Sequence, residues 1–213
     1  VVNYGALAHK IDRIKAAAHD VWGLERGAIV GILSTNSIEY IEYVSALSEM
    51  GIGIATINYR LSAAEVAQIS ADSGTQIIFY HEECSHLLPP DIPSHNLSDA
   101  LPDASPCPEI ALDEEDIFAI PYTSGTTGLP KGVMISHRAR VMTFYGMAAE
   151  YQCFSVDSYF LAIAPLCHGA GFAFGFAPLF FGGTVELMSD FNPERVISAL
   201  ARKEADGVFM VPA

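Results

Sequence analysis

Positively charged residues are scarce in this sequence. Its 213 residues include 11 Lys and Arg against 25 Asp and Glu, which gives a formal net charge of −14. No Lys or Arg occurs from Leu61 to Pro130, a span that holds twelve acidic residues. This charge disfavours nucleic acid and anionic membrane surfaces as main partners. It also repels polyanionic ligands, so any affinity for them must come from local donors and a divalent cation.

Long apolar runs are absent too. None reaches the roughly 20 residues that a membrane-spanning helix needs. The apolar segment from Gly169 to Phe181 is shorter and is interrupted by Gly171, Gly175 and Pro178. No basic stretch followed by a small-residue cleavage site precedes the first helical pattern, so the sequence predicts no signal peptide. We therefore expect a cytoplasmic protein without a transmembrane segment.

Cysteine is rare, and its spacing matches no zinc-binding pattern. The four cysteines are predicted to be reduced thiols: Cys84, Cys107, Cys153 and Cys167. Hydrophobic residues make up 51% of the chain and charged residues only 17%, which argues against disorder. A chain of this length and composition can bury a sizeable core.

What the sequence does contain is an alternation of helical patterns and apolar runs. Strands are predicted over 28–33, 52–57, 75–80, 117–122, 133–135, 159–164, 183–187 and 207–211, and helices over about 7–21, 37–50, 63–73, 136–151, 169–181 and 193–204. Ser62 with Glu65 forms a capping box, and Asn36 or Ser37 can cap the helix that follows it. Pro193 sits at a first helical position.

This alternation predicts an α/β fold, with mainly parallel sheets flanked by helices in two βαβ-type layers. Residues 1–80 are assigned to the first layer and residues 117–213 to the second. Between them, residues 81–116 hold six prolines from Pro89 to Pro108 and end in the acidic run Asp113 to Asp116. We interpret this segment as a proline-rich, acidic connection.

The first candidate site is a loop rich in glycine and hydroxyl groups between two apolar runs. It contains Thr123, Ser124, Gly125, Thr126, Thr127, Gly128 and Lys131. Glycine lets backbone N–H groups converge on an anion, hydroxyls add donors, and the lysine adds a mobile charge. The common P-loop is excluded because Pro130 stands where its second glycine is required. The composition favours a polyphosphate ligand.

The second candidate site lies at the end of the strand predicted over 159–164. There His168 follows Pro165 and precedes Gly169 and Gly171, which leaves room for a ligand. Ligands of open parallel sheets gather at the carboxyl ends of strands, so His168 and the glycine-rich loop are expected to share a cleft. The phenylalanines that follow, Phe172, Phe174 and Phe176, fit either a core or a binding wall.

Four segments resemble one known family. The run from Tyr122 to Gly132 resembles the phosphate-binding signature of the adenylate-forming (AMP-binding) superfamily, which includes acyl- and aryl-CoA ligases, luciferases and the adenylation domains of peptide synthetases. Three further segments resemble other family motifs, in chain order: 58–61, 165–172 and 181–185. The similarity extends over nearly the whole chain.

The resemblance implies an acid–thiol ligase that uses ATP, Mg²⁺ and coenzyme A on a hydrophobic fatty or aryl acid. Thr123 to Gly128 would wrap the ATP phosphates, with the Thr123 hydroxyl as a magnesium ligand. Lys131 would neutralise the leaving pyrophosphate. His168 would orient against the acid, with Gly169, Gly171 and Phe172 lining the acid site.

The family's later Tyr-Gly-x-Thr-Glu segment, its ribose-binding aspartate and its C-terminal domain with a catalytic lysine have no counterpart here. By the resemblance, the chain is expected to be the incomplete front part of the large N-terminal domain and inactive alone. Three alternatives remain open: a module that loads a carrier-protein thiol, a non-catalytic nucleotide-binding module, and a purely structural domain. A homo-oligomer is also possible.

Overall fold

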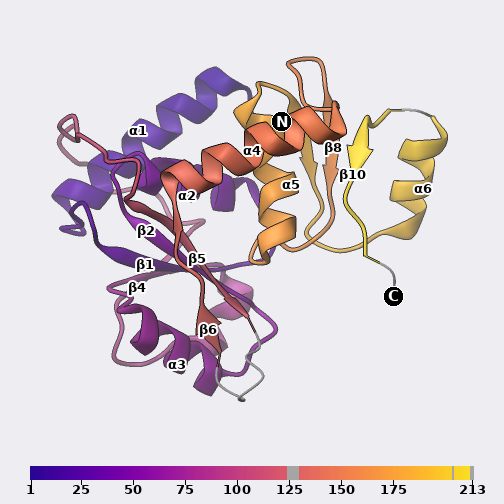
Figure 1. Cartoon of the computed structure of the whole chain (residues 1–213). Helices are drawn as coiled ribbons and strands as arrows, with labels where there is room; N and C mark the ends of the chain where they lie inside the picture. The colour runs from indigo at the N-terminus through magenta and orange to yellow at the C-terminus, as the bar shows by residue number, and fades with distance from the viewer. Residues whose placement is uncertain (124–129, 203, 212–213) are drawn as a thin grey trace. The chain divides into compact units, whose positions relative to one another are not determined.

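The computed structural model describes residues 1–123, 130–202 and 204–211, which fall into two compact units (Figure 1). The first unit comprises residues 1–34 and 38–138, and the second comprises 35–37 and 139–213. This grouping differs from the division expected from the sequence. The strand that begins at Ile117 pairs within the first sheet, so the second unit begins after Arg138.

The first unit is built on a mainly parallel sheet, which confirms the predicted fold class. Five strands follow the order β4-β3-β1-β2-β5, and all neighbours among them are parallel. Their bounds are β1 (Ile29–Leu33), β2 (Gly53–Ile57), β3 (Ile78–Tyr80), β4 (Ser94–Asn96) and β5 (Ile117–Thr123). All residues of β2 are buried, as expected for a central strand covered on both faces.

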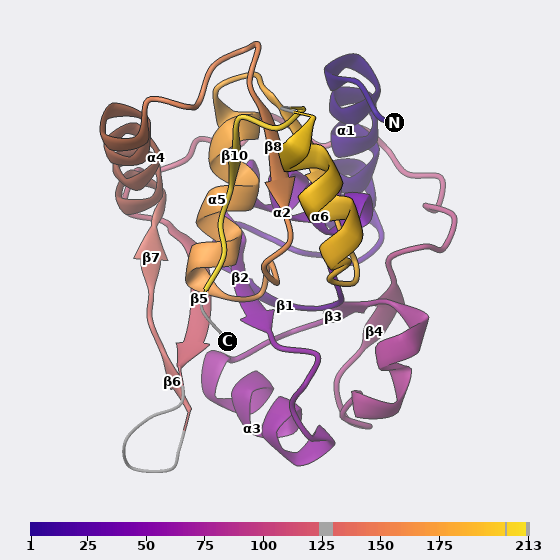
Figure 2. The ribbon, with the colours of Figure 1, turned by 90° about the vertical axis from the view of Figure 1, so that its right-hand side faces the viewer.

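Helices cover both faces of this sheet (Figure 2). Helices α1 (Tyr4–Asp20) and α2 (Ile38–Ser48) lie on one face, and α3 (Ala63–Ser73) lies on the other with the 3₁₀ helix η1 (Glu82–Leu87) beside it. The strands and helices on the α3 side share an apolar core: Leu33, Ile57, Val66, Ile69, Ile78, Cys84 and Leu87. This core fixes α3 against the sheet.

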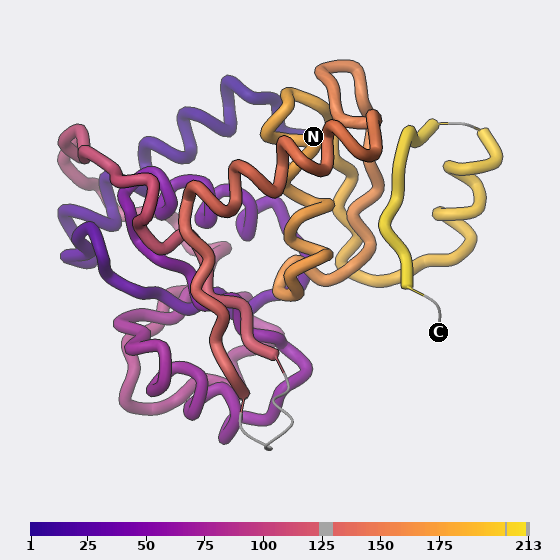
Figure 3. Tube along the Cα trace, viewed as in Figure 1, coloured from indigo at the N-terminus to yellow at the C-terminus, as the bar shows by residue number. Residues whose placement is uncertain are grey.

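After β5 the chain turns back along the same strand (Figure 3). It does so in two short antiparallel pieces, β6 (Lys131–Gly132) and β7 (Ile135–Ser136), where the sequence predicted one strand over 133–135. Val133 and Met134 separate the two pieces, and the register of the β5–β7 pairing shifts between Ile117 and Ala119. The predicted proline-rich connection also carries structure, because it contains η1 and the edge strand β4.

The second unit has a parallel sheet of three strands in the order β10-β8-β9. The strands are β8 (Tyr159–Ala162), β9 (Thr184–Leu187) and β10 (Gly207–Val208), and the helices are α4 (His137–Tyr151), which enters from the first unit, α5 (Gly169–Phe180) and α6 (Pro193–Ala201). Helix α6 begins at the Asn192 cap, whose side chain accepts the Arg195 N–H at 2.9 Å. No disulfide joins the four cysteines, all within the described ranges. In the part of the chain that the structure describes, no helix is long and apolar enough to cross a membrane.

Candidate functional site

The glycine-rich loop is carried by the hairpin of β5 and β6 in the first unit. Thr123 lies opposite Lys131 in the antiparallel register, and Tyr122 lies opposite Gly132. Residues directly opposite each other project to the same face of such a pair. The exposed Thr123 hydroxyl and the exposed Lys131 ammonium therefore lie on one face of the hairpin end. Five residues with predicted roles lie outside the described residues: Ser124, Gly125, Thr126, Thr127 and Gly128.

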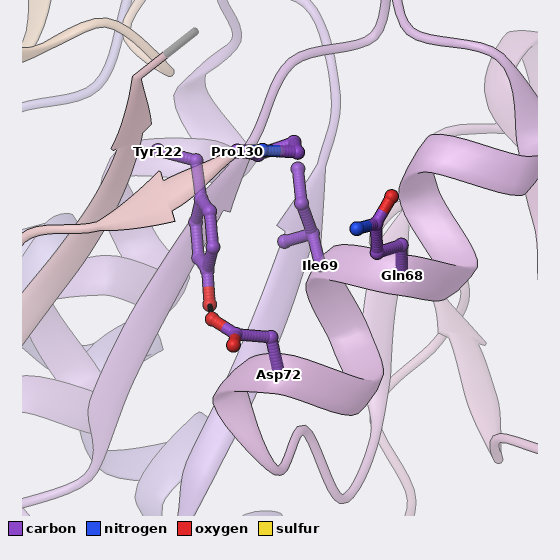
Figure 4. A pocket seen from close by; sticks show the side chains of 5 residues that line it. All are labelled: Gln68, Ile69, Asp72, Tyr122 and Pro130. Carbon is purple, nitrogen blue, oxygen red and sulfur yellow. Dashed lines mark hydrogen bonds between the residues drawn. The ribbon is translucent and has the colours of Figure 1, made fainter. Parts of the chain in front are cut away.

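The side chain of Tyr122 links this hairpin to α3 (Figure 4). Its hydroxyl donates a hydrogen bond to the Asp72 carboxylate at 2.7 Å. Burial, followed by the hydrogen bond to Asp72, raises the pKa of Tyr122 to about 12, so the phenol stays protonated and remains a donor at neutral pH. The pair borders a small cavity of about 120 Å³ that Gln68, Ile69 and Pro130 also line. Sequence reasoning missed Asp72, because nothing in the pattern of α3 marks it.

In the second unit, His168 is the residue that starts α5. Its backbone is extended (φ −99°, ψ 142°), and its carbonyl accepts the Phe172 N–H at 2.7 Å. Its own N–H donates to the Pro165 carbonyl at 3.1 Å, which closes a turn after β8. The side chain is exposed. The structure thus places His168 beyond the carboxyl end of a parallel strand, while its contact with an acid stays a prediction.

Two of the glycines after His168 serve helix packing, whereas a Cβ on Gly169 would meet no atom within 4 Å. A Cβ on Gly171 would lie 2.1 Å from the Pro165 carbonyl oxygen, and a Cβ on Gly175 would lie 2.4 Å from Leu166 Cδ2. Both positions let α5 approach the segment that follows β8. These contacts explain why residue 171 is a glycine without reference to a ligand.

Phe172, a predicted substrate contact, is buried with 1% of its surface exposed. Its ring stacks on Phe176 with centroids 4.2 Å apart, and the Arg140 guanidinium carbon lies 4.8 Å from its centroid. Burial lowers the pKa of Arg140 to about 10, so the guanidinium remains charged at neutral pH. In this structure Phe172 is a core residue, and its predicted contact with an acid remains a prediction.

The His168 turn is anchored by Asn36, a residue interpreted from sequence as a helix cap. Asn36 belongs to the short segment 35–37 of the second unit and is 6% exposed. Its amide nitrogen lies 3.0 Å from the Ala164 carbonyl and 3.1 Å from the Met188 carbonyl, while its oxygen accepts the Leu166 N–H at 2.8 Å. One side chain therefore ties the end of β9 to the segment that leads to His168.

The described residues offer no ready-made cation site. No group of three or more His, Cys, Asp or Glu side chains is arranged to hold a metal within 1–123, 130–202 and 204–211. The acidic run Asp113 to Asp116 is instead engaged in structure: Asp116 accepts two hydrogen bonds from Arg26 at 2.8 and 2.9 Å.

Two curated relatives match most of the chain. The feruloyl-CoA synthase of Amycolatopsis sp is 32% identical over 99% of this chain and 44% of its own length. The 2-succinylbenzoate–CoA ligase of Geobacillus kaustophilus is 30% identical over 90% of this chain and 39% of its own length. The chain therefore spans less than half the length of these relatives.

A solved structure shows the same fold. The o-succinylbenzoate coenzyme A synthetase of Bacillus subtilis, in complex with ATP and magnesium ion, has a TM-score of 0.83 to this chain. It covers 97% of the chain, while the chain covers 56% of it, and the identity is 21%. The sequence profile of the AMP-binding enzyme family matches residues 1–213. With this match and the two relatives, the chain belongs to the AMP-binding enzyme family.

Proposed function

We propose that the complete protein that carries this chain activates a carboxylic acid with ATP and transfers the acyl group to coenzyme A. A carboxylate oxygen attacks the α-phosphorus of ATP, the bond to the β-phosphate oxygen breaks, and pyrophosphate leaves. The thiol then attacks the acyl carbonyl, loses its proton, and AMP departs. The relatives that match the chain carry names of acid–CoA ligases, which supports this reaction class.

One observation of the structure carries the proposal: the paired, exposed Thr123 and Lys131 at the end of the β5–β6 hairpin. Nucleotidyl transfer needs little covalent chemistry from the protein and depends on positioning and charge neutralisation. The Lys131 ammonium is a mobile cation suited to the departing pyrophosphate. Between Leu61 and Pro130 the sequence has no Lys or Arg, so Lys131 supplies the charge that this part of the chain otherwise lacks.

The hairpin end offers one ligand to an Mg²⁺ ion carried by ATP. The Thr123 hydroxyl is a hard oxygen ligand of the kind that Mg²⁺ accepts, and it is exposed. Phosphate oxygens and water are further oxygen ligands that Mg²⁺ accepts. When bound, the ion would neutralise phosphate charge.

His168 is proposed to lie against the acid. It stands exposed at the start of α5, where the Pro165 turn and the Asn36 anchor fix its backbone. An imidazole N–H there can donate to a carboxylate oxygen or to the acyl phosphate that forms from it. The apolar composition of α5, which begins directly after His168, favours a fatty or aryl acid.

Lys131→Ala in the complete protein tests the proposal. We expect ATP–pyrophosphate exchange to fall by roughly 10²-fold or more, as for loss of one preorganised charge in a transition state. The melting temperature should stay near that of the wild type because Lys131 is exposed. Lys10→Ala on α1 is the matched control and should keep full exchange. Unchanged exchange in Lys131→Ala would remove this lysine from the site.

The acceptor is settled by a second assay on the same protein. Wild-type enzyme given a panel of fatty and aryl acids should form thioesters with coenzyme A. Product formed only with a holo-carrier protein would identify a carrier-loading module instead. If no acid led to pyrophosphate release, the result would favour a non-catalytic nucleotide-binding module. Fractionation and sedimentation would test the expected cytoplasmic location and the possible homo-oligomer.

A further inference from the structure

A phenol–carboxylate hydrogen bond joins two elements that are far apart in sequence. Tyr122 belongs to β5, and Asp72 belongs to the last turn of α3, 50 residues earlier. Figure 4 shows the Tyr122 ring extending from the strand toward the helix, with its oxygen directed at the Asp72 carboxylate. Tyr122 immediately precedes Thr123. The hydrogen bond that holds this phenol therefore also helps to position the residue at which the hairpin end begins.

Gly132 makes room for this arrangement. It lies opposite Tyr122 in the hairpin, and a Cβ at this position would lie 3.0 Å from Tyr122 Cζ and 2.8 Å from Ile120 Cγ2. The tyrosine ring therefore passes over the backbone of the residue that follows Lys131. Both ends of the predicted phosphate-binding loop meet at one ring, through Tyr122 on β5 and Gly132 on β6.

Helix α3 is a firm support for the link. Its N-terminus is closed by the Ser62–Glu65 capping box, and its C-terminus ends at Gly74 in the left-handed conformation (φ 69°). Val66 and Ile69 are 0% and 1% exposed against the sheet. Asp72 itself is exposed, so its hydrogen bond adds little to the free energy of unfolding. The bond is better suited to orienting the hairpin than to holding the fold.

We infer that Asp72 and Tyr122 are a positioning pair for ATP binding, through which α3 fixes the direction in which Thr123 and Lys131 face the phosphates. The inference rests on the proposed function. Neither side chain is required to touch ATP. A hairpin released from α3 would swing its end, and displacements of about 1 Å at a reacting centre lower rates by up to about 10²-fold.

Tyr122→Phe in the complete protein removes the hydroxyl and keeps the ring over Gly132. We expect the KM for ATP in pyrophosphate exchange, and the Kd for Mg·ATP by calorimetry, to rise about tenfold. The KM for the acid should not change, and the melting temperature should stay within about 3 °C of the wild type. Tyr159→Phe is the matched control, because it removes a phenol hydrogen bond to Glu186 in the second unit.

Variants at Asp72 complete the test. Asp72→Asn keeps an oxygen that accepts the phenol hydrogen bond and should retain near wild-type ATP binding. Asp72→Ala should match Tyr122→Phe, and the double variant should be no worse than either single one. Additive effects, or a Tyr122→Phe enzyme with wild-type ATP parameters, would overturn the positioning role while leaving the ligase activity intact. Wild-type protein that neither binds Mg·ATP nor exchanges pyrophosphate would overturn both the proposed function and this inference.

Discussion

At the scale of single residues, Asn36 connects more segments of the second unit than its position in the sequence suggests. Its side chain contacts three carbonyls and one N–H that belong to segments more than a hundred residues away. These groups are buried or partly buried, so water cannot replace the amide. A buried polar group left without a partner costs about 1–3 kcal/mol.

Asn36→Ala is accordingly expected to lower the free energy of unfolding by about 2–4 kcal/mol. Urea-induced unfolding followed by circular dichroism measures the change. Asn192→Ala is the control, since it also removes an asparagine but one that caps α6 with a single hydrogen bond; about 1 kcal/mol is expected there. Equal decreases in the free energy of unfolding of the two variants would show that the buried contacts of Asn36 contribute no more than a single helix cap.

The role of Asn36 was beyond sequence reasoning for a physical reason. An asparagine just before a helical pattern satisfies the local rule for a cap, and its true partners follow from how β8 and β9 are placed in space. Lys131 and His168 were easier to single out. A lone lysine after a glycine-rich run and a histidine just past a strand are local signals. Asp72 gave no such local signal, because aspartate is a common residue on the exposed face of a helix.

At the scale of elements, the capping box of α3 is the clearest agreement between sequence and structure. The Ser62 N–H donates to the Glu65 carboxylate at 2.8 Å, and the Ser62 hydroxyl donates to the same oxygen at 2.7 Å. The backbone hydrogen bond first, and the hydroxyl second, lower the pKa of Glu65 below its usual value. Ser62 and Glu65 lie within four residues of each other in the sequence, so the local pattern alone predicted the start of this helix.

This lowered pKa predicts how the capping box depends on pH. A carboxyl whose pKa is lower in the folded state stabilises the fold above its unfolded pKa, about 4.3, and this contribution is lost as pH falls through the folded pKa. Glu65→Gln should therefore be less stable than the wild type at pH 7, and the difference should shrink as the pH falls below the unfolded pKa of Glu65. Thermal unfolding across that range measures it, with the exposed Glu109→Gln as a control for the lost charge. A difference of the same size at every pH down to full protonation of the carboxyl would contradict the hydrogen-bonded carboxylate.

Strand pairing was predicted less well than strand existence. Strand β5 follows the proline-rich segment in sequence and was therefore grouped with what comes after it, yet Ile54 of β2 pairs with Ala119 of β5. Both strands are apolar on both faces, so their pattern does not reveal a neighbour. Strand β4 escaped prediction because Ser94–Asn96 is a short polar edge strand with no apolar period.

At the scale of the whole molecule, two electrostatic effects on ATP oppose each other. The 213 residues carry a net charge of −14, which repels a nucleotide at long range. In the proposed function, Lys131 at the hairpin end would attract the nucleotide at short range. Varying the salt concentration distinguishes the long-range repulsion from the short-range attraction. Charges further apart than a Debye length are screened, while charges in contact are screened much less.

We expect the KM for ATP to fall when the salt concentration rises from about 10 mM to about 150 mM at saturating Mg²⁺. Over this range the Debye length shortens from about 30 Å to about 8 Å, which removes repulsion from distant acidic residues but spares contact between Lys131 and the phosphates. In Lys131→Ala the KM should start higher and fall more steeply, since only repulsion remains. Steady-state kinetics at four or five salt concentrations would measure both slopes. A KM that rises with salt in the wild type and not in Lys131→Ala would mean that attraction by this lysine outweighs the acidic background of the chain.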